Sequence, residues 1–216
     1  MTPDRLRRAL VALLREKGIA DERVLAALGA VPRHEFLDDG FGRRAYDDVA
    51  LPIGLGQTIS QPFTVARMTE LADVRPGDRV LEVGTGSGYQ AAVLAELGAR
   101  VFSIERHAPI LDRTVALLQR LGVRVRTRLG DGTLGWPAYA PYDAIVVTAG
   151  GAIVPDDLLD QLRPPKAGRP NARLVIPVGG VKKQVLHRIT RVGEAPGDVE
   201  VETFDGVVFV PLVRGA

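Results

Sequence analysis

Cysteine is absent from the 216-residue sequence, which excludes disulfide bonds, zinc–thiolate sites and a cysteine nucleophile. Long apolar runs are absent too. The short run at residues 9–14 is followed at once by charged side chains, so neither a membrane span nor a signal peptide is predicted. A cytoplasmic location is consistent with both absences. The net charge is small as well, because 28 basic and 26 acidic residues sum to +2. A charge this close to zero gives no reason to expect a nucleic-acid partner.

What the sequence does contain is the composition of a globular protein, with 46% apolar and 25% charged residues. Its length suits one domain with additions. We predict a single domain over residues 1–216, made of N-terminal helices and a loop (1–75), a core (76–180) and C-terminal antiparallel strands (181–216). We expect a monomer without a metal site or a membrane partner.

Three glycines in alternate positions stand at the centre of the chain. Gly84, Gly86 and Gly88 follow the apolar run Val80–Val83 and precede a helix-like run, Tyr89–Leu97. Strand, glycine turn and helix in this order form the first half of a nucleotide-binding βαβ unit. Glycines let the backbone turn sharply and approach a ligand closely, and the helix N-terminus behind them favours an electron-rich group.

The glycine spacing distinguishes between ligands. Dinucleotide folds usually have G-x-G-x-x-G, whereas this chain has G-x-G-x-G preceded by Glu82, a form similar to that of S-adenosylmethionine-dependent methyltransferases. The next apolar run, residues 101–104, ends in Glu105, about 20 residues after the turn, where an acid is placed to bind a ribose diol. The alternative is an ordinary tight turn with a surface glutamate.

Further apolar runs predict the fold class. Residues 80–83, 101–104, 123–129, 142–148 and 172–178 are expected strands, separated by helical patterns. We predict an α/β fold, a Rossmann-like, doubly wound and mostly parallel sheet with helices on both faces and an N-terminal helical extension. Residues 184–192 and 199–213 follow too closely for a parallel crossover and are expected to pair antiparallel.

Two polar positions lie where such a sheet binds ligands. Asp131 follows the third strand, so it could accept a hydrogen bond from an adenine amino group or simply cap its loop. Residues 38–61 contain no long periodic segment and form a predicted loop of the functional or mobile kind. This loop brings Ser60 and Gln61 to the N-terminus of a helix expected over 63–71, where they could form an anion site or only cap the helix.

Several motifs along the chain resemble protein-L-isoaspartate O-methyltransferases. The most specific is Gln57–Ser60, which general methyltransferases lack. The resemblance extends from the first helix nearly to the C-terminus. Its motifs are Val31–Phe36, Gly56–Pro62, Leu81–Tyr89, Gly130–Gly132, Ala140–Asp143, Gln161–Leu162, Ile176–Gly179 and Phe209–Leu212.

The resemblance implies a repair enzyme. The family moves a methyl group from S-adenosylmethionine to the carboxylate of L-isoaspartyl residues in damaged peptides and proteins, leaving S-adenosylhomocysteine; the ester then closes to a succinimide that can reopen as aspartate. Ser60 would be the active-site serine, and the substrate carboxylate would be surrounded by Thr58, Ile59, Ser60 and Gln61. The expected donor contacts are Ile53, Gly54, Leu55, Gly56, Gln57, Gly84, Thr85, Gly86, Gly88, Glu105, Arg106, Asp131 and Gly132.

The implied chemistry needs little catalytic apparatus. A side-chain carboxylate with a pKa of about 4 is already ionised near neutral pH and needs no general base. Ser60 is therefore expected to position the carboxylate and not to act as a nucleophile. Two departures from the family pattern stand out: the loop Pro164–Asn171 is longer, and Val213 replaces a polar residue found near the donor in some members.

Other functions share part of this pattern. A methyltransferase of the same fold acting on RNA or a small molecule is the main alternative, although the near-neutral charge and the lack of an aromatic-basic strip argue against RNA. The glycine spacing argues against an NAD-linked oxidoreductase. A non-catalytic binding module is disfavoured because the glycines, Glu105, Asp131 and Ser60 are all intact.

Overall fold

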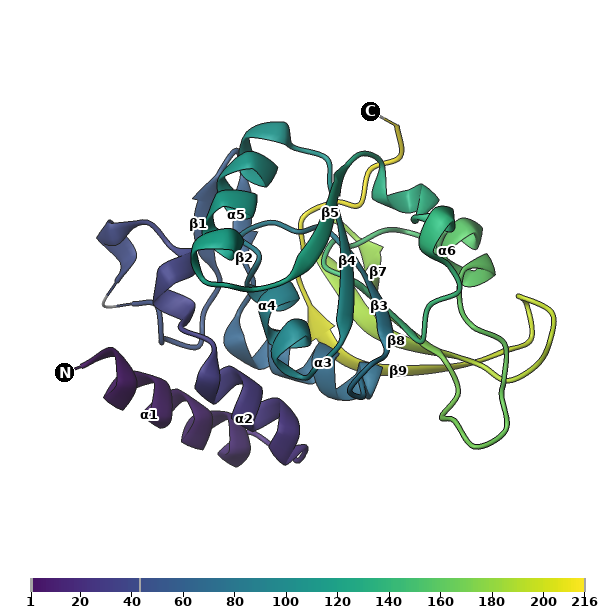
Figure 1. Ribbon diagram of the computed structural model, residues 1–216, viewed down its shortest axis with the longest axis horizontal. Coiled ribbons are helices and arrows are strands. Elements are labelled where there is room, and N and C mark those ends of the chain that lie inside the picture. Colours follow the sequence, from purple (N-terminus) through teal and green to yellow (C-terminus); the bar gives the residue numbers. More distant parts are fainter. Residues whose placement is uncertain (1, 43, 216) are drawn as a thin grey trace.

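The computed structural model describes residues 2–42 and 44–215, which form one twisted sheet with helices on both sides (Figure 1). The seven strands are arranged in the order β5-β4-β3-β6-β7-β8-β9. The first five in this order are parallel, whereas β8 pairs antiparallel with both β7 and β9. These strands are β3 (Arg79–Val83), β4 (Arg100–Glu105), β5 (Val125–Leu129), β6 (Ala144–Val147), β7 (Arg173–Gly180), β8 (Lys183–Arg191) and β9 (Val199–Val207).

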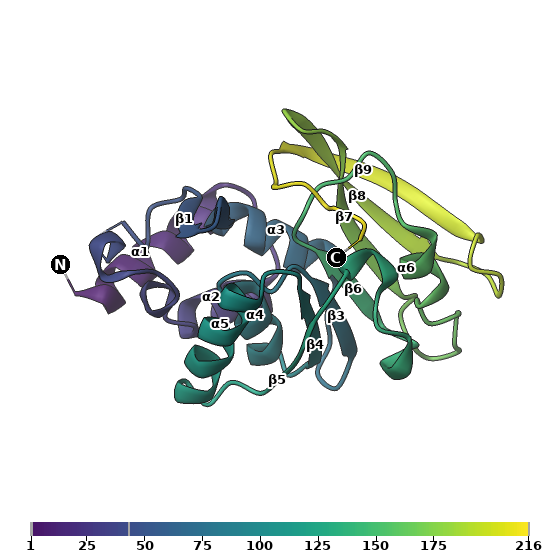
Figure 2. The ribbon, with the colours of Figure 1, turned by 90° about the horizontal axis from the view of Figure 1, so that it is seen from above.

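The helices divide unevenly between the two faces of the sheet. Figure 2 shows α3, α4 and α5 on one side of the parallel strands and α6 on the other. The helices are α1 (Pro3–Glu16), α2 (Glu22–Ala30), α3 (Pro62–Ala72), α4 (Tyr89–Glu96), α5 (Ala108–Arg120) and α6 (Asp156–Asp160), with short 3₁₀ turns at Arg33–Phe36, Asp39–Phe41, Gly132–Leu134 and Pro137–Tyr139. The predicted fold class is confirmed.

The centre of the sheet is apolar on both faces. All four residues of β6 are buried, as are the last four of β3, because helices or turns cover each side. The continuous apolar runs that predicted these strands are therefore explained by their burial. Parallel strands direct their carboxyl ends to one edge of the sheet, and this edge is where the candidate site lies.

The N-terminal helices extend the core on the α4 side. Leu10 and Leu14 of α1 join Leu25 and Leu28 of α2 in one apolar cluster, which also contains Tyr89 of α4. In Figures 1 and 2 these helices lie at the end of the molecule away from the β8–β9 connection. No helix within residues 2–42 and 44–215 has the length and apolar character to cross a membrane.

Residues 38–61 are more ordered than their sequence indicates. They contain a short antiparallel hairpin of β1 (Leu51–Gly54) and β2 (Gln57–Ile59), with an irregular register between Pro52 and Gly54. Two strands of four and three residues are too short to show an alternating apolar pattern, so the sequence predicted only a functional or mobile loop and not the hairpin within it. The hairpin delivers residues 57–60 to the sheet edge.

The end of the chain also differs from expectation. β9 ends at Val207, so the predicted strand over 199–213 is six residues too long. The remaining segment turns back, and Gly150 is hydrogen-bonded on both sides to it, through its N–H to the carbonyl of Val210 and through its own carbonyl to the N–H of Leu212. Residues 210–213 therefore reach the carboxyl edge of the parallel strands.

Candidate functional site

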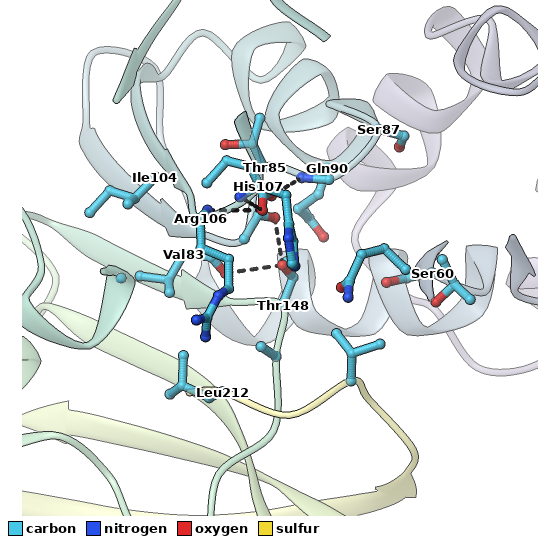
Figure 3. Close-up of a pocket in the computed structure, with 18 of the residues that line it drawn as sticks. Ser60, Val83, Thr85, Ser87, Gln90, Ile104, Arg106, His107, Thr148 and Leu212 are labelled. Carbon is cyan, nitrogen blue, oxygen red and sulfur yellow. Dashed lines mark hydrogen bonds between the residues drawn. The ribbon is translucent and has the colours of Figure 1, made fainter. Parts of the chain in front are cut away.

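A cavity of about 320 Å³ lies at the carboxyl edge of the parallel strands. Its walls come from the glycine turn after β3, the end of β4, the loop after β6, residues 57–60 and the returning segment 210–213. Figure 3 shows Ile104 and Ser60 at opposite ends of the group of lining side chains, with Thr85, Arg106 and Thr148 between them. Segments far apart in the sequence thus converge on one space, as the position of the strand ends predicts.

The glycine turn is fixed by the strand beside it. Gly84 adopts a φ of +97°, and a Cβ atom there would collide with the hydroxyl of Thr148. That hydroxyl donates hydrogen bonds to the carbonyl oxygens of Gly84, at 2.6 Å, and Val83, at 3.0 Å. Only glycine combines this backbone conformation with such close contact, so the turn stays open toward the cavity.

Glu105 stands at the end of β4 and lines the cavity with only 5% of its surface exposed. One carboxylate oxygen accepts the N–H of Gly86 at 2.9 Å, and the other accepts those of Arg106 and His107 at 2.9 and 3.0 Å. Three backbone donors hold the carboxylate rigidly beside the glycine turn. Each oxygen keeps further lone-pair capacity for a ligand hydroxyl.

Glu82 occupies a contrasting environment under the same turn. Its side chain is completely buried, and it accepts a short hydrogen bond from the hydroxyl of Ser103, which is itself bonded to Thr85. The other carboxyl oxygen has no hydrogen-bond partner in the described part of the chain. Burial raises the pKa of Glu82 to about 8, so this carboxyl is largely protonated at neutral pH. It supports the turn from below and does not line the cavity.

Ser60 stands between two cavities. Together with Thr58 it lines both the cavity at the glycine turn and a second one of about 510 Å³, which is also lined by residues of α3, β8 and β9. Ser60 is half-buried, and within residues 2–42 and 44–215 its hydroxyl makes no hydrogen bond to the protein. The hydroxyl is thus a donor and acceptor still available at the junction of two spaces.

The N-terminus of α3 is capped from a distance. Neither Ser60 nor Gln61 caps it; instead, Asp48 accepts the N–H of Phe63 at 2.8 Å through one carboxylate oxygen. The other oxygen accepts from the side-chain amide of Gln61, at 3.1 Å, and from Lys17, at 2.6 Å. The carboxylate of Asp48 therefore occupies the helix N-terminus where an anion site was expected. Gln61 holds the loop in place and lines only the second cavity.

The structure brings most, but not all, of the predicted site residues together. Those lining the first cavity are Gln57, Thr58, Ile59, Ser60, Gly84, Thr85, Gly86, Glu105, Arg106 and Gly132. Among the described residues, those outside its lining are Ile53, Gly54, Leu55, Gly56, Gln61, Gly88 and Asp131.

The predicted residues outside the cavity have other neighbours. The side chain of Leu55 is 60% exposed at the hairpin turn, with an unusual φ of +50°. The carbonyl of Ile53 accepts a hydrogen bond of 2.6 Å from Arg113 of α5, which ties the hairpin to that helix. A Cβ on Gly88 would meet Thr114 of α5. These three positions set how the hairpin and the two helices pack around the cavity.

Asp131 and Arg106 both contact the end of the chain. Asp131 accepts the N–H of Gly215 at 2.7 Å and also caps Thr133. Although partial burial opposes ionisation, these hydrogen bonds lower the pKa of Asp131. The guanidinium of Arg106 donates to the carbonyls of Val213, at 3.3 Å, and Gly215, at 3.4 Å. Both side chains thereby hold the returning segment next to the cavity.

Several lining residues were not predicted. Thr148 and His107 follow β6 and β4, so the rule that ligands bind at the carboxyl ends of strands would have found them. Gln90, in the first turn of α4, is another. Residues 210–212 belong to the motif Phe209–Leu212 of the family resemblance, but they were not predicted to line the site because their return across the sheet depends on tertiary packing. The described residues contain no group of three or more His, Cys, Asp or Glu side chains able to hold a metal ion.

Comparisons with known proteins point to one family. The family model described as protein-L-isoaspartate(D-aspartate) O-methyltransferase matches residues 5–216. A protein-L-isoaspartate O-methyltransferase from Salinibacter ruber is 60% identical over 209 residues, covering 96% of this chain and 91% of its own length. One from Xanthomonas campestris pv. campestris is 49% identical over 215 residues, covering 100% of this chain and 92% of its own.

Solved structures show the same architecture. A protein-L-isoaspartate O-methyltransferase with 28% identity superimposes with a TM-score of 0.82 over 95% of this chain, which spans 65% of that protein's length. A Plasmodium falciparum protein solved in complex with S-adenosyl-L-homocysteine has 23% identity and a TM-score of 0.80, covering 97% of this chain and 99% of its own. At that identity, the second likeness supports the fold alone.

Proposed function

The chain belongs to the protein-L-isoaspartate(D-aspartate) O-methyltransferase family, and on that premise we propose that it transfers a methyl group from S-adenosylmethionine to the free carboxylate of L-isoaspartyl residues in damaged peptides and proteins. The ester closes to a succinimide, from which normal aspartate can form. One observation carries the proposal beyond the family name: Ser60, with a hydroxyl left unbonded by the described residues, stands at the junction of two cavities.

The first cavity has the features that an adenosyl methyl donor requires. Glu105 offers a fixed carboxylate for ribose hydroxyls, Ile104 offers an apolar wall, and Gly84 and Gly86 leave the backbone accessible. S-adenosylmethionine supplies an activated methyl group on a sulfonium, which no residue of this chain has to generate. The donor contacts predicted from the sequence remain part of this proposal. Those that line the first cavity support it most directly.

The protein's own contribution is positioning. A substrate carboxylate with a pKa of about 4 is ionised at neutral pH, so no base is needed to activate it. The hydroxyls of Ser60 and Thr58 hold its oxygen at the entrance from the second cavity into the first. Holding reacting groups in line lowers a barrier by roughly 7–11 kcal/mol, which is the main part of the catalysis proposed here.

A matched-peptide assay tests this function. The protein is incubated with S-adenosylmethionine carrying a labelled methyl group and with peptides of one sequence containing either isoaspartate or aspartate. We expect base-labile methyl ester on the isoaspartyl peptide alone. Label on RNA or on a small molecule, with none on the peptides, would contradict the proposal. The monomeric state, the cytoplasmic location and the absence of a metal, of a nucleic-acid partner and of a membrane partner stay predictions.

A further inference from the structure

The second cavity lies between α3 and the ends of β8 and β9, and it shares Thr58 and Ser60 with the first cavity. If the proposed function holds, the methyl donor occupies the first cavity and the isoaspartyl carboxylate reaches Ser60. The peptide that flanks the isoaspartyl residue then has to approach from the side of the second cavity, whose volume is about 510 Å³.

The charged side chains at the second cavity differ in whether they are paired. Arg67 of α3 is paired with Asp205 of β9 at 3.0 Å and with Glu70 at 2.8 Å, so its charge is matched. Lys183, at the start of β8, is exposed and has no carboxylate within 4.0 Å among the side chains that the structure describes. Lys183 is therefore the one charged side chain lining this cavity without an ion-pair partner among the described side chains, although with Glu70 counted the local charges sum to zero.

The rest of the lining suits an extended peptide. Phe63, Leu186 and Phe209 give apolar surface, while Thr64 and the shared Thr58 offer hydroxyl groups. Such a mixed lining can accept side chains of many kinds, and the unpaired Lys183 is the one lining residue that distinguishes them by charge. Opposite charges attract, and an acidic group desolvated beside a lysine is favoured over a basic one.

From this arrangement we propose that the peptide flanking the isoaspartyl residue lies in the second cavity and that Lys183 selects substrates with an acidic side chain close to the damaged residue. Lys183 is thus a specificity-determining residue of the proposed reaction. Its contribution lies in substrate binding, because Lys183 lines the second cavity and not the one at the glycine turn.

The test uses isoaspartyl peptides with Glu, Gln or Lys at each of three positions on either side of the isoaspartate. At low salt we expect at least one position where Glu gives a kcat/KM roughly 3- to 10-fold above Lys, mainly through KM. The preference is expected to shrink in 0.5 M NaCl, because salt screens exposed charges.

Variants of two adjacent lysines provide the control. Lys183→Gln is expected to reduce the Glu-over-Lys preference to less than about 2-fold, Lys183→Glu to reverse it, and Lys183→Arg to retain it. Lys182→Gln removes the same charge from the neighbouring residue, which does not line the cavity, and is expected to keep the preference. Thermal melting of each variant shows whether its fold is intact.

Two results would overturn the inference: no charge preference at any of the six positions in the wild type, or a preference that survives unchanged in Lys183→Gln. Both leave the proposed function standing, because isoaspartyl peptides would still be methylated. Failure of the wild type to methylate any isoaspartyl peptide would instead refute the proposed function, on which this inference rests.

Discussion

Two glutamates beside the glycine turn differ because their surroundings differ. Glu105 receives three backbone N–H groups and faces the cavity, whereas Glu82 receives one short hydrogen bond from Ser103 and is sealed from solvent. A carboxylate is stabilised by donors and destabilised by burial. The sequence assigned the ligand contact to Glu105, which lines the cavity, but it gave no role to Glu82, whose burial depends on tertiary packing.

Glu82 gives a prediction about stability against pH. Its pKa rises from 4.5 in the unfolded chain to about 8 in the folded protein, so the folded state binds the proton more tightly. The stabilising effect is complete below pH 4.5 and is lost as pH rises through 8, with a slope of up to about 1.4 kcal/mol per pH unit. The neutral Glu82→Gln variant lacks this dependence.

Urea unfolding of both proteins at pH 5, 6.5 and 8 checks this prediction. The free energy of unfolding of the wild type minus that of Glu82→Gln is expected to fall by several kcal/mol over this range. Taking the difference removes the contribution of all other titrating groups. A difference that is constant with pH would show that Glu82 is ionised when the protein is folded.

Ser60 gives a prediction about the reaction. Ser60→Ala removes the hydroxyl that we assign to positioning, and a hydrogen bond to a charged group is worth roughly 1.5–3 kcal/mol. Steady-state kinetics with an isoaspartyl peptide are expected to show a rise in KM and a modest loss of kcat, with the KM for S-adenosylmethionine unchanged. Complete loss of activity, together with a covalent adduct on Ser60 in the wild type, would show a nucleophile instead.

At the scale of elements, the start of α3 depends on segments distant in sequence. Arg33 is fully buried and donates hydrogen bonds to the carbonyls of Ala45, at 2.8 Å, and Val49, at 3.3 Å. These bonds hold the segment that contains Asp48, and Asp48 in turn binds Phe63 and Gln61. The position of the residues next to Ser60 is thus set by the N-terminal extension, which gives that extension a role in the site.

Asp48→Ala is expected to destabilise the protein by about 2 kcal/mol, because it removes a helix cap and leaves the side-chain amide of Gln61 with only the backbone carbonyl of residue 48 as acceptor. The KM for the isoaspartyl peptide is expected to rise as the loop loosens. Lys17→Met is the matched control, since it removes a partly exposed ion pair with Asp48 and a contact of the ammonium with the Phe63 ring but leaves the cap intact, and it should cost less than about 1 kcal/mol. Equal effects of the two changes on urea unfolding and KM would refute the capping role.

An element could be predicted where its own residues determine its structure, and was missed where residues distant in the sequence determine it. β6 was predicted because a strand covered on both faces needs a continuous apolar run, and Ala144–Val147 has one. The β1–β2 hairpin was missed because its strands are short and its partner contacts are tertiary, such as the bond from Arg113 to Ile53. The cap of α3 was missed for the same reason, since Asp48 lies in another segment.

At the scale of the whole molecule, the wall of the first cavity is completed by residues 210–213, near the end of the chain. Motif spacing predicted the glycine turn and Glu105, which lie within one βαβ unit. It could not predict that Asp131 and Arg106 would bind Gly215 and Val213, because those contacts join the core to residues near the end of the chain. The returning segment also supplies Val213 to the wall of the first cavity.

Removing residues 213–216 is therefore expected to weaken methyl-donor binding more than peptide binding. The bonds that anchor Leu212 to Gly150 remain, but Arg106 loses the carbonyls of Val213 and Gly215, Asp131 loses the N–H of Gly215, and the first cavity loses Val213 from its wall. A loss of about 1.4 kcal/mol corresponds to a roughly tenfold rise in the KM for S-adenosylmethionine. Arg214→Ala, which breaks only an exposed ion pair of 3.5 Å with Asp157, is the control and should leave that KM unchanged. An unchanged KM in the shortened protein would mean that the returning segment covers the cavity without contributing to the donor site.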